Sequence, residues 1–190
     1  NKGSQEYAHT VNEINSRYGD FLSNQLKVSD SYDNIANSVR GVKDALMEKA
    51  RADAYSAGIN TIQTDLTNRL KELYPEIESK FKSIFNFTQS LSGAFDSVEI
   101  SEMISSMLSK IKENPELIKD SNELGKAMAG LINSGLREKG FDTFISPQDI
   151  YRVSYLLSRN VLKPFIDYGE AISNATQQTE QLDRMVNSLY

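Results

Sequence analysis

A long heptad stripe in the first quarter of the chain limits the folds open to this sequence more than any other feature. Between residues 11 and 46, apolar side chains recur at alternating steps of three and four, and Gln25 is the only polar residue in the series. A hydrophobic repeat of 3.5 residues is typical of a left-handed coiled coil, because it keeps one stripe facing the partner helix. We therefore predict one long helix over residues 5–57, ending at Gly58. The apolar positions are Val11, Ile14, Tyr18, Phe21, Val28, Tyr32, Ile35, Val39, Val42 and Leu46.

A second stripe of the same kind runs to the end of the chain, with Thr179 as its polar position. The step from Leu157 to Val161 is four residues where three are due, which is a stutter that locally unwinds a supercoil. Pro164 follows directly, so we predict a kink there. The apolar positions are Ile150, Val153, Leu157, Val161, Phe165, Tyr168, Ile172, Ala175, Leu182, Val186 and Leu189.

The start of this second helix carries three separate signals. Ser146 can cap the N-terminus, Pro147 suits the first helical position, and Asp149 lies in the positively polarised first turn. A long apolar stripe cannot be buried by its own helix, so the two stripes predict that the terminal helices pair with each other. The pairing would be antiparallel, with Val11 near Leu189.

The predicted fold is mainly α, a long intramolecular antiparallel coiled coil of the N- and C-terminal helices with a small, mostly helical inserted domain. Residues 1–57 and 148–190 would form the coiled coil, and residues 58–147 the insert. Two amphipathic helices of an ordinary bundle are the alternative, although ordinary helices average about 11–12 residues and these stripes are much longer.

Within the insert, apolar periodicity predicts helices over residues 59–73, 100–112 and 124–136. Pro75 should break or restart the first of them. Residues 141–145 alternate aromatic and polar side chains and are the only clear strand candidate, although an isolated strand needs a partner.

Composition argues against several classes of function. The chain of 190 residues has no cysteine and a net charge of −5, and no basic stripe with interleaved aromatic residues appears. We therefore expect no thiol chemistry and no nucleic-acid partner. No apolar run approaches the roughly 20 residues of a membrane span, and the first residues lack the pattern of a cleaved signal peptide.

The sequence offers no catalytic constellation. His9 is the only histidine and falls on the polar side of the first predicted helix, where we expect it to be solvated. A zinc site would need several His or Cys ligands. There is also no glycine-rich phosphate loop. We therefore expect no enzymatic activity, no metal site and no cofactor.

Two segments resemble the needle-tip proteins of bacterial type III secretion systems, the hydrophilic translocator family. Val11-Asn12-Glu13-Ile14-Asn15-Ser16-Arg17-Tyr18 resembles the "I-N-D-I-N-x-Q-Y" opening of that family's first coiled-coil helix. The C-terminal residues 171–175 and 182–189 are similar to its closing helix, rich in Ser and Asn around a Leu/Val seam. The resemblance covers about the first 45 and last 40 residues. The family's N-terminal helical hairpin has no counterpart here, and the central segment is helical in pattern where many members are mixed α/β.

The resemblance implies a structural, non-enzymatic function at the bacterial surface, in a secreted protein that caps the needle. The implied partners are the needle subunit, the hydrophobic translocator proteins and further copies of the chain at the tip. A bile-salt-like small molecule is a weaker expectation, in a groove near Tyr55, Ile59 and Ile150. The last turn is apolar without a polar cap, so a further expectation is a docking end formed by Leu182, Val186, Leu189 and Tyr190.

A helical membrane-active toxin component or a secreted filament subunit is the competing interpretation, since both also use long helices. A toxin usually carries a contiguous apolar tongue for insertion, and none is visible. Contact with liposomes would separate a toxin from a needle-tip protein.

Overall fold

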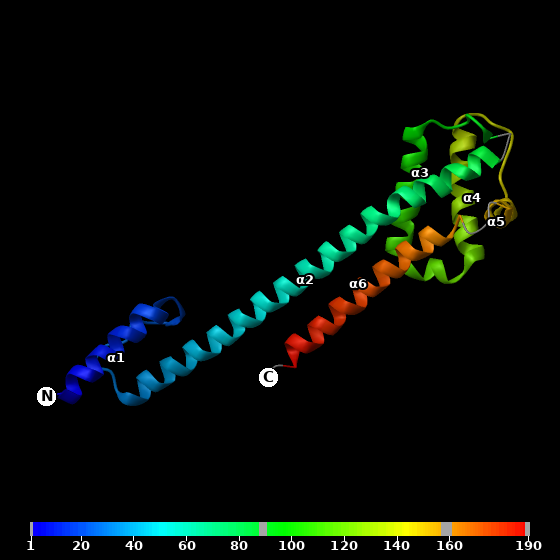
Figure 1. Ribbon diagram of the computed structural model, residues 1–190. Helices are drawn as coiled ribbons and strands as arrows, with labels where there is room; N and C mark the ends of the chain where they lie inside the picture. The colour runs from blue at the N-terminus through cyan, green and yellow to red at the C-terminus, as the bar shows by residue number, and fades with distance from the viewer. Residues whose placement is uncertain (1, 88–90, 157–160, 189–190) are drawn as a thin grey trace. The chain divides into compact units, whose positions relative to one another are not determined.

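The computed structural model describes residues 2–87, 91–156 and 161–188 and confirms a mainly α fold (Figure 1). It is 84% helical, with six α-helices and no strand among those residues. The chain divides into two compact units, which are described separately. Unit 1 comprises Asn1–Ile59 with Asp183–Tyr190, and unit 2 comprises Asn60–Leu182.

Unit 1 begins with two helices where the sequence predicted one. Helix α1 covers Lys2–Tyr18, a short 3-10 helix η1 covers Gly19–Phe21, and α2 starts only at Tyr32. The single helix over residues 5–57 is therefore wrong. The break has local causes, because glycine is a poor helix former and short polar residues such as Asp30 and Ser31 favour turns and caps. The Asp30 carboxylate accepts a hydrogen bond from the Lys27 N–H at 2.8 Å.

Hydrogen bonds hold the segment between α1 and α2 against α1. The Asn15 side-chain amide donates to the Leu26 carbonyl and accepts from the Leu26 N–H, both at 2.8 Å. Nearer the start of α1, the Tyr7 hydroxyl donates to the Asp30 carbonyl at 3.5 Å. Since Tyr7 meets Asp30 and Asn15 meets Leu26, the segment runs back along α1 before α2 begins.

This return makes α1 and α2 parallel neighbours. Val11 and Ile35 are buried together with Leu26 in a small cluster. Further along both helices, the Lys49 ammonium lies 5.5 Å from the centre of the Phe21 ring. The predicted stripe is therefore folded on itself, and its α1 part packs against its α2 part.

Helix α2 is a continuous helix over Tyr32–Phe87. The predicted end at Gly58 is wrong, and this glycine does not adopt the positive φ of a helix-terminating residue. The predicted break at Pro75 is also wrong. A proline inside a helix costs about 3 kcal/mol. Burial of Leu73, Ile77 and Phe81 around it offsets that cost.

Unit 2 packs the second half of α2 against the remaining helices. These are α3 (Ser97–Glu113), the short η3 (Pro115–Lys119), α4 (Ser121–Glu138), α5 (Pro147–Leu156) and α6 (Lys163–Asn187). The predicted helices over residues 100–112 and 124–136 are confirmed as parts of α3 and α4. One large core joins residues from α2 to α6.

Helices α2 and α6 run antiparallel and side by side in this unit (Figure 1). The Phe81 and Phe165 rings meet edge to face with their centres 6.1 Å apart. The predicted antiparallel pairing is thus shown only in part, because α6 meets α2 at Leu66 and Phe81, which lie in the predicted insert, while α1 packs on the start of α2. The contact predicted between Val11 and Leu189 involves Leu189, which lies outside the described ranges.

The C-terminal stripe is divided between two helices. Its start is confirmed, because Ser146 Oγ accepts from the Asp149 N–H at 3.2 Å while the Asp149 carboxylate accepts from the Ser146 N–H at 2.8 Å. The Ser146 hydroxyl also donates to the Asp149 carboxylate at 2.7 Å, and this bond, followed by the one from the Ser146 N–H, holds the pKa of Asp149 below its usual value. Instead of one kinked helix, α5 ends at Leu156 and α6 begins at Lys163. Pro164 therefore lies in a first helical turn, where its missing N–H costs nothing. The stutter itself involves Leu157, which lies outside the described ranges.

The predicted strand over residues 141–145 is also wrong. The segment joins α4 to α5 and has no helix, turn or strand assignment. Gly140 ends the preceding turn with a φ of 76°. The Phe141 N–H donates to the Leu136 carbonyl at 2.9 Å, which closes the end of α4. Its aromatic alternation is real, but no neighbouring strand exists among the described residues.

Candidate interaction surfaces

An open apolar groove lies between α1 and α2 in unit 1. Its volume is about 430 Å³. The lining comes from the last turns of α1 and from about three turns of α2. It consists of Ile14, Tyr18, Val39, Val42, Lys43, Leu46, Met47 and Ala50. We call this feature the α1–α2 groove.

The groove exists because two apolar stripes meet without fully covering each other. Val42 is buried, but Tyr18, Val39 and Met47 remain 37%, 41% and 45% exposed. Lys43 is the single charged residue in the lining, and it forms no ion pair within the described part of the chain. Apolar surface at helical spacing beside one unpaired cation is suited to an amphipathic helix that carries a carboxylate.

A second groove, of about 330 Å³, lies between α2 and α6 in unit 2. Its lining is far more polar. Lys163 bonds the Asp167 carboxylate at 2.6 Å, and this contact holds the pKa of Lys163 above its usual value. Arg69 also lines the groove and pairs with Glu72 at 3.3 Å. Because both of its cations, Lys163 and Arg69, already have carboxylate partners, we regard this groove as a solvent-exposed helix junction.

The predicted seam residues have unequal surroundings. Buried are Val11, Ile35, Val42, Val161, Phe165, Tyr168 and Ile172. Half-buried are Ile14, Phe21, Leu46, Leu182 and Val186. Exposed are Tyr18, Val28, Tyr32 and Val39. Leu189 lies outside the described residues.

The structure brings Ile14, Tyr18, Val39, Val42 and Leu46 to one surface, the α1–α2 groove. The groove is completed by Lys43, Met47 and Ala50, which lie outside the predicted seam. Met47 directly follows the seam residue Leu46, and the other two lie four residues from Val39 and Leu46. A second apolar stripe beside the first was the signal that could have identified them.

The candidate docking end is described only in part. Leu182 and Val186 are half-buried, and the neighbouring Met185 is 61% exposed. Leu189 and Tyr190 lie outside the described ranges.

Of the three residues expected near a small-molecule groove, Tyr55 and Ile59 are half-buried. Ile150 is fully buried in the core of unit 2, so its side chain has no surface to offer a ligand.

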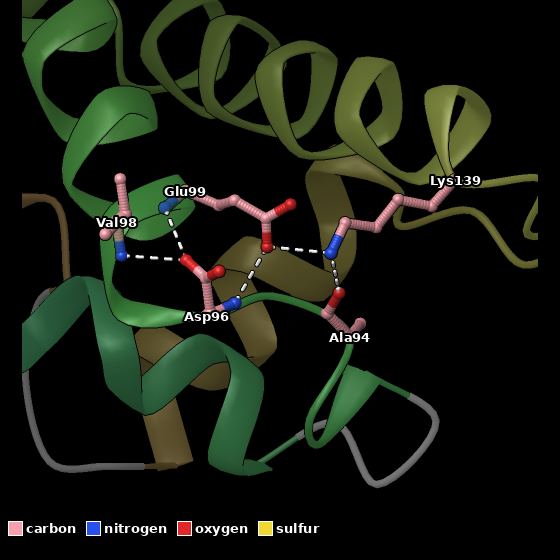
Figure 2. Close-up of polar contacts among 5 residues, drawn as sticks. All are labelled: Ala94, Asp96, Val98, Glu99 and Lys139. Carbon is pink, nitrogen blue, oxygen red and sulfur yellow. Dashed lines mark hydrogen bonds and ion pairs between the residues drawn. The ribbon is translucent and has the colours of Figure 1, made fainter.

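The best-connected polar cluster in unit 2 joins the start of α3 to the end of α4 (Figure 2). The Lys139 ammonium donates to the Glu99 carboxylate at 2.7 Å and to the Ala94 carbonyl at 2.8 Å. Glu99 also accepts from the Asp96 N–H, while the Asp96 carboxylate accepts from the Val98 and Glu99 N–H groups. This is a capping box tied to a second helix, and every charge in it has a structural partner.

The Lys139 hydrogen bond, followed by the one from Asp96, holds the pKa of Glu99 below its usual value of 4.5. A carboxylate whose pKa is lower in the folded protein than in the unfolded chain stabilises the fold at pH values above its pKa in the unfolded chain. This stabilisation disappears as the pH falls through the pKa in the folded protein. We expect Glu99→Gln to lower the melting temperature at pH 7 and to match the wild type progressively better below pH 4.5. Thermal unfolding followed by circular dichroism across this range checks it.

Glutamine can still accept the Asp96 N–H bond, so the substitution removes mainly the charge facing Lys139. Glu102→Gln, on the exposed side of α3, is the control and should leave the melting temperature unchanged. A Glu99→Gln deficit that stays the same at every pH would contradict the ion-pair explanation.

His9 is exposed on α1. No group of three or more His, Cys, Asp or Glu side chains is arranged to hold a metal ion within the described ranges. Among the helices that the structure describes, none is both long and apolar enough to cross a bilayer.

Comparison with known proteins found no matching family model, no matching curated protein and no matching solved structure.

Proposed function

We propose that this protein is a non-enzymatic structural subunit that caps a type III secretion needle and helps to assemble the translocon at the host membrane. The observation that carries the proposal is the α1–α2 groove, a helical docking surface built from the segment that resembles the needle-tip family. The antiparallel contact between α2 and α6 is in keeping with it, since the family resemblance implies that a long helix near the start of the chain runs antiparallel to the last one.

The lining of the α1–α2 groove is suited to binding a helix. Two parallel helices present apolar side chains at i, i+3 and i+4 spacing, which complements the apolar face of an amphipathic helix. Lys43 would meet a carboxylate on the polar edge of that helix. We propose that the needle subunit supplies the helix.

The remaining partners follow from the resemblance. Unit 2 would face the hydrophobic translocators, and the exposed Met185 with Leu182 and Val186 would offer a second contact near the C-terminal end. In this proposal the protein acts outside the bacterium, at the tip of the needle.

A single charge in the groove tests the proposal. We expect Met47→Glu to weaken binding of the purified protein to assembled needles at least about tenfold, because an unpaired carboxylate must lose its water on docking. Met47 is 45% exposed, so the fold should tolerate the change. Cosedimentation with needles measures binding, and circular dichroism checks the helical content.

Val98→Glu is the matched control, since Val98 is 66% exposed on α3 and lies far from α1 in sequence. It should bind needles as the wild type does. Wild-type protein that does not cosediment with needles would refute the proposed function. Equal binding by the Met47 and Val98 variants would refute the groove as the docking surface.

A further inference from the structure

The segment of residues 141–145 bonds to α4 through its two ends. The Phe141 N–H donates to the Leu136 carbonyl at 2.9 Å. The Ile145 N–H and carbonyl both bond the Asn133 side-chain amide, each at 2.8 Å. In an extended chain, the N–H and C=O of one residue lie on the same side, and those of its neighbours lie on the opposite side. Phe141 and Ile145 thus direct backbone groups toward α4.

The same alternation directs the backbone groups of Asp142 and Phe144 away from α4. Both residues are exposed, and neither has a hydrogen-bond partner for its N–H or C=O within the described chain. Figure 1 shows this connection as the yellow trace between α4 and α5, with no strand beside it. A row of free N–H and C=O groups is a template for pairing with another extended segment.

We propose that residues 141–145 pair antiparallel with the same segment of a second copy of this chain. The spacing is self-complementary. If Asp142 lies opposite Phe144 of the second copy, each such pair exchanges two hydrogen bonds, and the two-fold axis passes beside Thr143. The pairing makes four hydrogen bonds and uses only backbone groups that α4 leaves free.

Charge complementarity favours a second copy as the occupant. The Arg137 guanidinium lies 5.3 Å from the centre of the Phe144 ring and has no carboxylate partner among the described residues. Directly opposed side chains in an antiparallel pair lie about 5 Å apart. Asp142 of one copy would therefore meet Arg137 of the other, and the two-fold axis makes this ion pair twice. The inference goes beyond the proposed function, because it assigns a surface for self-association that does not involve the needle.

A cysteine at the axis tests the pairing. The natural chain has no cysteine, so Thr143→Cys introduces a single thiol. Facing residues of a non-hydrogen-bonded pair have Cα atoms about 4.5 Å apart, which a disulfide can span. Under mild oxidation we expect a disulfide-linked dimer at least about tenfold faster than for Ser105→Cys, an exposed position on α3. Non-reducing electrophoresis measures the rate. Equal rates for the two variants overturn the proposal.

Charge reversal tests the register in the Thr143→Cys background. Asp142→Arg and Arg137→Asp should each slow dimer formation several-fold, and the double variant should recover it, since the ion pairs re-form with exchanged signs. None of these changes removes a hydrogen bond between the segment and α4, and Arg137→Asp loses only the exposed contact with the Phe144 ring, so the monomer should keep its circular dichroism spectrum. A double variant as slow as the single ones overturns this register. A peptide or another protein that binds the edge while Thr143→Cys stays monomeric would overturn pairing between copies.

Discussion

Truncation of Phe165 to alanine is expected to lower the free energy of unfolding by about 3–5 kcal/mol, the range for a large side chain removed from a packed core. Phe165 has no exposed surface, and its ring meets Phe81 edge to face at 6.1 Å. The Phe81 ring in turn lies 5.6 Å from Phe85. The substitution therefore leaves a cavity where α6 packs against α2. Urea unfolding followed by the helical signal measures the loss.

Phe144→Ala is the matched control for that experiment. The same residue type is 51% exposed there, where its ring contacts the Arg137 guanidinium. It should change the free energy of unfolding by less than about 1 kcal/mol. Similar losses for both variants would contradict the assignment of Phe165 to the core.

The first heptad stripe shows what periodicity can predict and what it cannot. The pattern correctly selected Val11, Ile35 and Val42 as buried. Periodicity identifies the apolar face of a helix, but it does not name the element that covers that face. The chain reverses between α1 and α2, so α1 covers this part of α2. Gly19 with Asp20, and the run Ser29-Asp30-Ser31, carried the turn signal that an unbroken stripe concealed.

At Pro75 a helix break was predicted from the local sequence, but α2 continues through this residue. Proline usually ends a helix because it lacks an N–H and its ring crowds the preceding turn. In α2 the flanking residues Leu73 and Ile77 are both buried in the core of unit 2. Burial of two large side chains contributes about 3–6 kcal/mol, which is enough to offset a cost of about 3 kcal/mol. Local propensity could not show this, because the compensation comes from helices far away in sequence.

The strand predicted over residues 141–145 is wrong, because no neighbouring strand lies beside it among the described residues. At Ile145 the Asn133 side chain takes the place of such a strand. Asn15 does the same for Leu26 in unit 1. A side-chain amide can both donate and accept, so it satisfies both backbone groups of one residue. A single asparagine on a helix gives no sequence signal that distinguishes this role from a solvated one.

The α1–α2 groove could be predicted only in part. Five of its lining residues belong to the heptad stripe, and the sequence indicated that they are apolar and on one face. Their assembly depends on the reversal at residues 19–31, which brings Ile14 beside Val42. Ile14 and Val42 both belong to the single helix predicted over residues 5–57, and on one straight helix they could not meet.

Gly169→Ala is expected to lower the free energy of unfolding by about 1–3 kcal/mol, although alanine is the better helix former. A Cβ at this position of α6 would lie 2.5 Å from Ile118 Cγ2 and 3.1 Å from Ile111 Cγ2. Ile111 is fully buried, and the Ile118 methyl group is attached close to its backbone, so neither can move aside easily. The added methyl group must therefore separate α6 from η3 and α3. Urea unfolding at constant m value measures the change.

Gly130→Ala distinguishes this steric cost from the general effect of replacing a helical glycine. Gly130 is exposed on α4, and a Cβ there would meet nothing within 4 Å. That substitution should raise the free energy of unfolding by up to about 1 kcal/mol, opposite in sign to Gly169→Ala. In an Ile118→Ala background, the cost of Gly169→Ala should shrink, because the nearest methyl group is gone. If Gly169→Ala stabilises the protein as Gly130→Ala does, α6 cannot approach η3 as closely as the structure places it.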